Sequence, residues 1–133
     1  MSSDEQFFKE LVDGYHAEGR FGHRQHVHLT WSTIGRYGPD GALRRIVAFI
    51  QHVAAARGVP EKYNETVSRF WVRIVAHAME SSSSQDGFEP FVEQHPALLD
   101  KELALRHWSP AALWSDVAKR EWVEPDVRPI PFG

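Results

Sequence analysis

Residues 39–78 decide the fold, and they read PDGALRRIVAFIQHVAAARGVPEKYNETVSRFWVRIVAHA. Apolar residues recur there at intervals of three and four positions, the spacing that places side chains on one face of a helix. Gly58 suits the position just after a helix ends, and Pro60 suits the first turn of the next helix. The stretch therefore predicts two consecutive amphipathic helices, over about residues 39–58 and 60–78.

Two further helices are expected before this stretch, over about residues 4–17 and 24–37, because apolar residues keep the same spacing there. Shorter helices are expected after it, at about residues 87–94, 97–105 and 110–121. The tail at residues 124–131 contains three prolines and should run extended. The sequence thus predicts an all-α fold, a compact helical bundle of four main helices with shorter C-terminal helices and an extended proline-rich tail.

The whole chain, residues 1–133, is expected to form a single helical domain, because it is too short for two independent cores. The helical stripes predict the following core residues: Leu43, Ile46, Ile50, Val67, Phe70, Trp71 and Ile74. The N-terminus does not have the basic and apolar regions of a signal peptide, so we expect a cytoplasmic protein. A membrane span is not expected, since no apolar run approaches about 18 residues. The net charge of −3 argues against general binding to nucleic-acid phosphates.

The densest group of chemically versatile side chains is Gly22-His23-Arg24-Gln25-His26-Val27-His28. His23 and His26 are three positions apart, so on a helix they share a face and can touch one ligand. Thr30 follows His26 by four positions, so it lies on the same face of the expected helix. Imidazoles at the start of a helix have pKa values that move easily across neutrality, which favours acid–base chemistry. Helix capping and surface exposure explain the same pattern without any function.

The second group is Tyr63-Asn64-Glu65-Thr66, near the start of the helix predicted at residues 60–78. The positive end of a helix stabilises a carboxylate, which is a purely structural explanation for Glu65. The functional interpretation is a general base, which requires Glu65 to face into the bundle. Burial there would raise its pKa toward the range that is useful for proton transfer. Of the two tryptophans among the C-terminal helices, Trp108 and Trp114, either could line a pocket.

Three motifs resemble those of a family of small, mostly uncharacterised bacterial all-α proteins. They are Phe-x-His-Arg-x-His at residues 21–26, Tyr-x-Glu-Thr at residues 63–66, and Trp-Val-x-x-Val-Ala-His at residues 71–77. The likeness continues through residues 96–101, 108–110 and 122–126, so it covers most of the chain. The family pattern is His-Arg-Asp-His and Tyr-His-Glu-Thr, whereas this chain has Gln25 and Asn64 at the variable positions. More distantly, the chain resembles small Pictet–Spengler cyclases of actinomycete alkaloid pathways, which condense tryptophan with carbonyl compounds.

These residues and resemblances predict an enzyme of secondary metabolism that acts on a small aromatic or amino-acid-derived molecule by metal-independent acid–base catalysis, without a cofactor. The predicted pocket lies between the helices at residues 24–37 and 60–78 and the C-terminal segment. Glu65 is the expected base, and the expected acid or orienting groups are His23, His26 and Tyr63. The expected substrate-binding residues are Tyr63, Asn64, Thr66, Thr30 and Trp108.

Two alternatives stay open. In the first, His23, His26 and Glu65 bind a metal ion and leave one coordination position open, as catalytic zinc sites do. In the second, the chain is a non-catalytic module that binds a ligand or dimerises, and the histidines belong to its surface. A homodimer is compatible with either.

Overall fold

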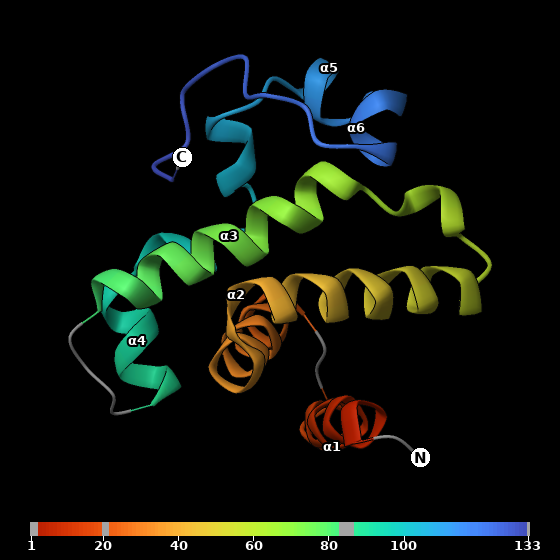
Figure 1. Ribbon diagram of the computed structural model, residues 1–133, viewed down its shortest axis with the longest axis vertical. Coiled ribbons are helices and arrows are strands. Elements are labelled where there is room, and N and C mark those ends of the chain that lie inside the picture. The colour runs from red at the N-terminus through yellow and green to blue at the C-terminus, as the bar shows by residue number, and fades with distance from the viewer. Residues whose placement is uncertain (1–2, 20–21, 83–86, 133) are drawn as a thin grey trace.

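The computed structural model describes residues 3–19, 22–82 and 87–132, and within these ranges it contains helices and no strands (Figure 1). The predicted all-α fold is therefore confirmed. The elements are α1 (Ser3–Ala17), α2 (His23–Ala56), η1 (Pro60–Lys62), α3 (Glu65–Ser81), α4 (Phe88–Gln94), η2 (Pro96–Leu99), η3 (Leu103–Arg106), α5 (Pro110–Leu113) and α6 (Asp116–Arg120), where η marks a 3-10 helix. None of the helices in the described ranges is long and apolar enough to cross a membrane.

Helix α2 bends sharply at Gly38, which divides it into the two helices that the sequence predicts. Gly38 has φ of 77° and ψ of 169°, outside the helical range, and Pro39 follows it. In Figure 1 the first half of α2 is seen nearly end-on, whereas the second half runs across the picture. The break therefore changes the direction of the chain and opens an angle between the two halves.

Substituting Gly38 with alanine tests whether this bend is fixed by the backbone. A Cβ atom at Gly38 would meet nothing within 4 Å, but its φ and ψ fall in a region that is essentially restricted to glycine. We expect Gly38→Ala to lower the free energy of unfolding by about 1–3 kcal/mol, measured by urea denaturation.

The matched control is Gly35→Ala, three residues earlier in the first half of α2. Gly35 is exposed and helical, and a Cβ atom there also has free space. Alanine is favoured over glycine inside a helix, so this variant should be stabilised by up to about 1 kcal/mol. Equal effects of the two substitutions would contradict a strained backbone at Gly38.

The second half of α2 and helix α3 lie side by side and run in opposite directions (Figure 1). α1 is seen nearly end-on, like the first half of α2, so the four main helices do not share one axis direction. Side chains attach α1 to α2: the Asp4 carboxylate accepts hydrogen bonds from Tyr37 Oη at 2.6 Å and from Arg45 Nε at 2.9 Å.

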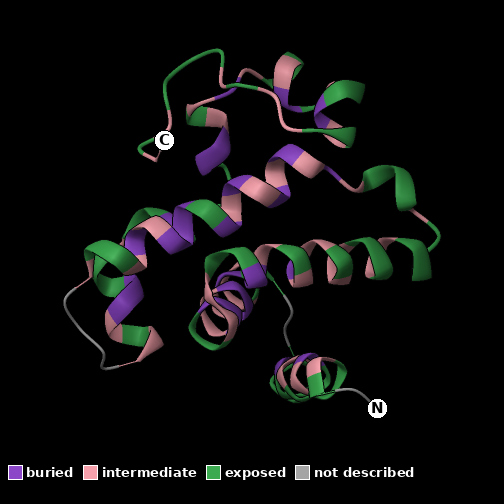
Figure 2. Cartoon of the chain, viewed as in Figure 1, coloured by how far each residue is buried: buried purple, intermediate pink, exposed green. Residues whose placement is uncertain are grey.

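The core follows one face of α3 and extends to the C-terminal elements (Figure 2). Three of the residues expected in the core are buried, namely Ile46, Phe70 and Ile74. The other four pack against the core but are only partly buried: Leu43, Ile50, Val67 and Trp71. Three of these four line a cavity, which explains their remaining exposure.

The C-terminal helices are shorter than the sequence suggests. The region expected to be helical at residues 97–105 forms the separate turns η2 and η3. The expected helix at residues 110–121 breaks into α5 and α6, because Ser115 accepts a hydrogen bond from Ala118 N and caps a new helix. The tail beyond α6 contains no helix up to residue 132, as predicted, and the backbone amide groups of Val127 and Arg128 donate to the carbonyl of His107.

Candidate functional site

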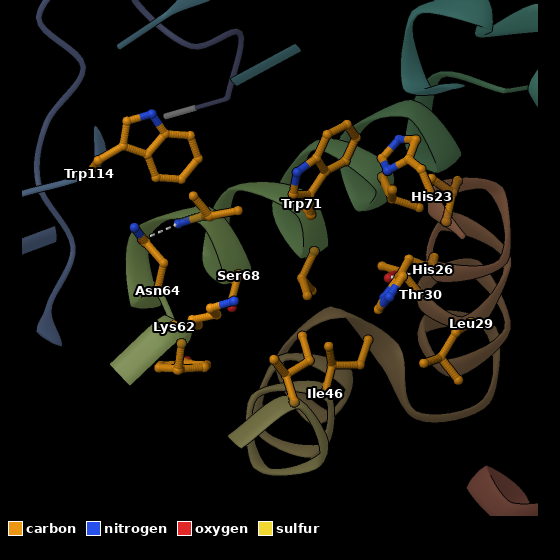
Figure 3. A pocket seen from close by; sticks show the side chains of 16 residues that line it. His23, His26, Leu29, Thr30, Ile46, Lys62, Asn64, Ser68, Trp71 and Trp114 are labelled. Atoms are coloured by element: carbon orange, nitrogen blue, oxygen red, sulfur yellow. Dashed lines mark hydrogen bonds between the residues drawn. The ribbon is translucent and has the colours of Figure 1, made fainter. Parts of the chain in front are cut away.

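A cavity of about 300 Å³ lies between the two halves of α2, the turn η1 and helix α3 (Figure 3). The bend at Gly38 separates the two halves of α2, and residues from both halves line the cavity together with residues of α3. Most of the wall is apolar and aromatic, and a few polar side chains interrupt it. Those polar side chains are His23, His26, Thr30, Lys62, Tyr63, Asn64 and Ser68.

Five of the residues predicted for the site line this one cavity. His23, His26 and Thr30 belong to the first turns of α2, where their spacing of three and four residues places them on one face. Tyr63 and Asn64 precede α3 and line the cavity from the other side. The fold thus assembles two sequence segments that are more than thirty residues apart.

His26 lies at the mouth of the cavity, where its side chain keeps an exposed surface while protein atoms crowd the rest of the ring. The loss of surrounding water lowers its pKa below the usual 6.5, and the positive ends of His23 and Arg57 lower it further. In Figure 3 the ring points toward the space between α2 and α3. His26 is therefore a neutral imidazole at pH 7, which is the form that accepts a proton.

His23 is fixed in position by two contacts. Its Nε2 donates a hydrogen bond to the carbonyl oxygen of Leu98 at 2.8 Å, since a carbonyl group can only accept. Its ring also meets Trp71 edge-on, with the ring centroids 4.6 Å apart. The neutral form of His23 thus carries its proton on Nε2, and Nδ1 is the nitrogen with a free lone pair.

Glu65, the expected base, does not line the cavity. Its Oε1 accepts a hydrogen bond from Tyr63 Oη at 2.6 Å, and its Oε2 accepts one from Arg69 Nε at 2.5 Å. Burial and the hydrogen bond to Glu65 both raise the pKa of Tyr63. Tyr63 therefore stands between Glu65 and the cavity as a neutral phenol, and Glu65 acts on the cavity only through Tyr63.

Asn64 and Thr66 bind backbone groups of this chain. Asn64 caps α3 by accepting from Val67 N at 2.9 Å, and its Nδ2 donates to the carbonyl of Leu113 at 2.8 Å. Thr66 is fully buried and does not line the cavity. Its hydroxyl group donates to the carbonyl of Glu121 and accepts from the amide of Val123. Two residues of the Tyr63–Thr66 motif therefore attach the C-terminal segment to the start of α3.

The alternative metal site is not assembled. Within the described ranges, no three histidine, aspartate or glutamate side chains are grouped closely enough to hold a metal ion. Although His23 and His26 share the cavity wall, both oxygens of Glu65 are occupied by Tyr63 and Arg69. The set of His23, His26 and Glu65 proposed from the sequence does not form a ligand shell in this arrangement.

The C-terminal tryptophan that lines the cavity is Trp114. Trp108, which the sequence suggested for substrate binding, is fully buried, and its Nε1 donates to the carbonyl of Val123 at 3.0 Å. Trp114 follows α5, is 53% exposed, and faces the cavity from the side opposite His26 (Figure 3). An exposed indole at a cavity mouth suits contact with a ligand, whereas a buried one suits the core.

Sequence reasoning did not assign Lys62, Ser68 or Trp71 to the site, although all three line the cavity. Ser68 and Trp71 are three residues apart on α3, and with Val72 and Val75 they form a helical stripe. That spacing was a usable signal for Ser68 and Trp71. Nothing in the sequence identified Lys62 as a residue of the cavity wall. It belongs to the short turn η1, and tertiary packing decides which way the side chains of such a turn point.

The third histidine of the same segment, His28, lies in a different environment. The hydroxyl group of Tyr15 on α1 and Nδ1 of His28 form a hydrogen bond of 2.5 Å, and the rings of Phe88 and Trp31 lie against the imidazole. Burial lowers the pKa of His28 below 6.5, and burial also raises the pKa of Tyr15. This contact attaches α1 to α2 and makes their packing sensitive to acid.

Mild acid is expected to destabilise the protein through His28 and His26. Their pKa values are lower in the folded chain than the ordinary 6.5, so the unfolded chain takes up protons first as the pH falls below 6.5. The free energy of unfolding should therefore fall between pH 7 and pH 5.5. Asp4 and Asp126 do not contribute in this window, because their pKa values lie below 3.8.

Urea denaturation at several pH values measures this effect, with His28→Gln as the comparison. Glutamine keeps an acceptor for the Tyr15 hydroxyl group but does not titrate. The pH dependence of the variant should therefore be weaker than that of the wild type. An unchanged stability of the wild type from pH 7 to pH 5.5 would contradict the lowered pKa values.

No family model, curated protein or solved structure matches this chain. The site is therefore interpreted from its own geometry: a small cavity with aromatic and aliphatic walls, a neutral imidazole at its mouth, and a phenol backed by an ion pair.

Proposed function

We propose that this protein is an enzyme that binds a small aromatic molecule in the cavity between α2 and α3 and converts it by acid–base catalysis, with His26 as the base. The observation that carries the proposal is the convergence of His23, His26 and Tyr63 on one mostly apolar cavity. Cavities of this kind, with a few polar groups on apolar walls, are the usual binding sites of small molecules. A cytoplasmic location and a homodimer remain expectations from the sequence.

His26 suits the role of base better than Glu65. A base must reach the proton that it removes, and His26 lines the cavity whereas Glu65 does not. The lowered pKa of His26 keeps it unprotonated at neutral pH. Glu65 becomes a positioning residue, since it holds the Tyr63 hydroxyl group by a hydrogen bond of 2.6 Å.

Tyr63 and the aromatic walls would orient the substrate. Tyr63 donates its hydroxyl proton to Glu65 and accepts a hydrogen bond from Ser68, so its phenol ring is held in a fixed position on the cavity wall. Trp71 and Trp114 supply indole surfaces on which a planar ring can pack. These features support a ligand that contains a planar aromatic ring.

The specific reaction that we propose is a Pictet–Spengler condensation, on the basis of the resemblance and of this chemistry. A protonated arylethylamine and an aldehyde lose water to form an iminium ion, which keeps the proton of the ammonium group. The double bond between carbons 2 and 3 of the indole then supplies the electron pair for a C–C bond to the iminium carbon, and the C=N π electrons pass to the nitrogen. The ring carbon then loses a proton, which His26 would accept and pass to water. The product has the summed mass of the two substrates less one water.

The experiment is to incubate the protein with tryptophan and an aldehyde and to detect the cyclised product by mass spectrometry. We expect product formation above the uncatalysed background, with an excess of one enantiomer, and we expect it to persist in the presence of a chelator. Binding of the aromatic compound without any product would contradict an enzyme for this reaction and would favour the ligand-binding module. Loss of activity on chelation, restored by a divalent ion, would contradict the metal-independent mechanism.

A further inference from the structure

We infer that the cavity selects aromatic carboxylates, with Lys62 as the residue that contacts the carboxylate group. This inference rests on the proposed function and narrows its ligand from any small aromatic molecule to an aromatic anion. It assigns a role to Lys62, which lies outside the two groups that the sequence indicated, residues 22–28 and 63–66.

The charge on the cavity wall is positive and comes from one residue. Of the described side chains that line the cavity, Lys62 carries an ammonium group, the imidazole of His26 is neutral at pH 7, and none is an aspartate or a glutamate. The nearest carboxylate in sequence on α3, that of Glu65, is turned to Arg69 and Tyr63. A cavity lined this way favours an anion and offers nothing to neutralise a buried ammonium group of a ligand.

Lys62 is available to a ligand. It is an exposed residue at the end of η1, and none of the ion pairs among the described residues involves it. In Figure 3 it extends toward Ser68, whose side chain is buried on the cavity wall. The ammonium group of Lys62 has three N–H donors, so it can hold a carboxylate group on this side of the cavity by charge-assisted hydrogen bonds.

The remaining walls fix how such a ligand would lie. In Figure 3 Lys62 and His26 are at opposite ends of the cavity, with Trp71 between them. A carboxylate held at Lys62 therefore directs the aromatic ring along Trp71, toward His26. A volume of about 300 Å³ is at the lower end of the range for ligand pockets, which suits a molecule of the size of an aromatic amino acid. In the condensation, the carboxylate would also balance the positive charge of the iminium ion.

Isothermal titration calorimetry with three probes tests the inference: indole-3-acetate as the anion, indole as the neutral ring and tryptamine as the cation. We expect indole-3-acetate to bind about tenfold more tightly than indole, from one charge-assisted hydrogen bond to Lys62. Tryptamine should bind more weakly than indole. Binding of tryptamine as tight as that of indole-3-acetate would overturn the inference.

The variants Lys62→Met and Lys62→Arg identify the residue responsible. Lys62→Met keeps much of the apolar stem, so the Kd for indole should stay the same while the preference for indole-3-acetate disappears. Lys62→Arg should keep most of that preference. A preference for the anion that survives in Lys62→Met would overturn the role of Lys62. If indole binds the wild type and indole-3-acetate binds no more tightly than indole, the selection of carboxylates is contradicted while the proposed function stands. If none of the three probes binds, the proposed function is contradicted as well.

Discussion

Replacing Trp108 with alanine should lower the free energy of unfolding by about 3–5 kcal/mol, the range found when a large buried aromatic side chain is removed. Trp108 has no exposed surface, and its ring meets those of Phe70 and Trp122 edge-on, with centroids 5.4 Å apart in each pair. Its Nε1 also donates to the carbonyl of Val123, which attaches the tail to the core. Urea denaturation followed by circular dichroism measures the loss.

Trp114→Ala is the control for this prediction, because it removes the same side chain from a site that is 53% exposed. Substitutions at exposed positions usually change stability by about 0.5 kcal/mol or less. If Trp108→Ala does not fold, Trp108→Phe provides the test, since it keeps a ring and should lose less than the alanine variant. Equal losses in Trp108→Ala and Trp114→Ala would contradict the placement of these two tryptophans.

The second large effect is expected at His26. If His26 is the base, His26→Gln should lower kcat by about 10²–10⁴-fold for the proposed condensation, the usual contribution of general acid–base catalysis. The fold should be retained, because His26 lies at the mouth of the cavity with an exposed surface. His52→Gln is the matched control: His52 is exposed on the same helix and lies outside the cavity.

The pH dependence of the rate provides an independent check on His26. A base must be unprotonated to act, so the rate should fall with decreasing pH around a pKa below 6.5, because burial lowers the pKa of His26. Glu65→Gln should have a smaller effect than His26→Gln, since Glu65 reaches the cavity only through Tyr63. Full activity of folded His26→Gln would remove His26 from the mechanism.

The positions of the main helices could be predicted because their signals are local. Apolar spacing identified the helices, and the expected boundary between residues 37 and 39 coincides with the bend at Gly38, where the observed φ of 77° favours glycine. The breaks near the C-terminus were harder to predict. Ser115 starts a new helix by capping it, and a serine in mid-sequence has no feature that distinguishes a cap from an ordinary helical position.

The site could be predicted only in part, for a physical reason. His23 and His26 could be grouped because helical spacing fixes their relation, and they do share the cavity. Whether Glu65 faces the cavity depends on the positions of its two partners, Arg69 and Tyr63. Which of the two C-terminal tryptophans is buried depends on where α5 ends. Such choices arise from tertiary packing, which residue spacing does not encode.

The indole N–H signals of the five tryptophans provide the most direct test of the central claim that the cavity between α2 and α3 binds an aromatic molecule. Trp71 and Trp114 line the cavity, whereas Trp31, Trp108 and Trp122 do not. A titration with indole, followed by ¹H–¹⁵N correlation spectra, should shift the signals of Trp71 and Trp114 in a saturable way and leave the other three nearly unchanged. Saturable shifts confined to Trp31 or Trp122, or no saturable shift at Trp71, would contradict the account.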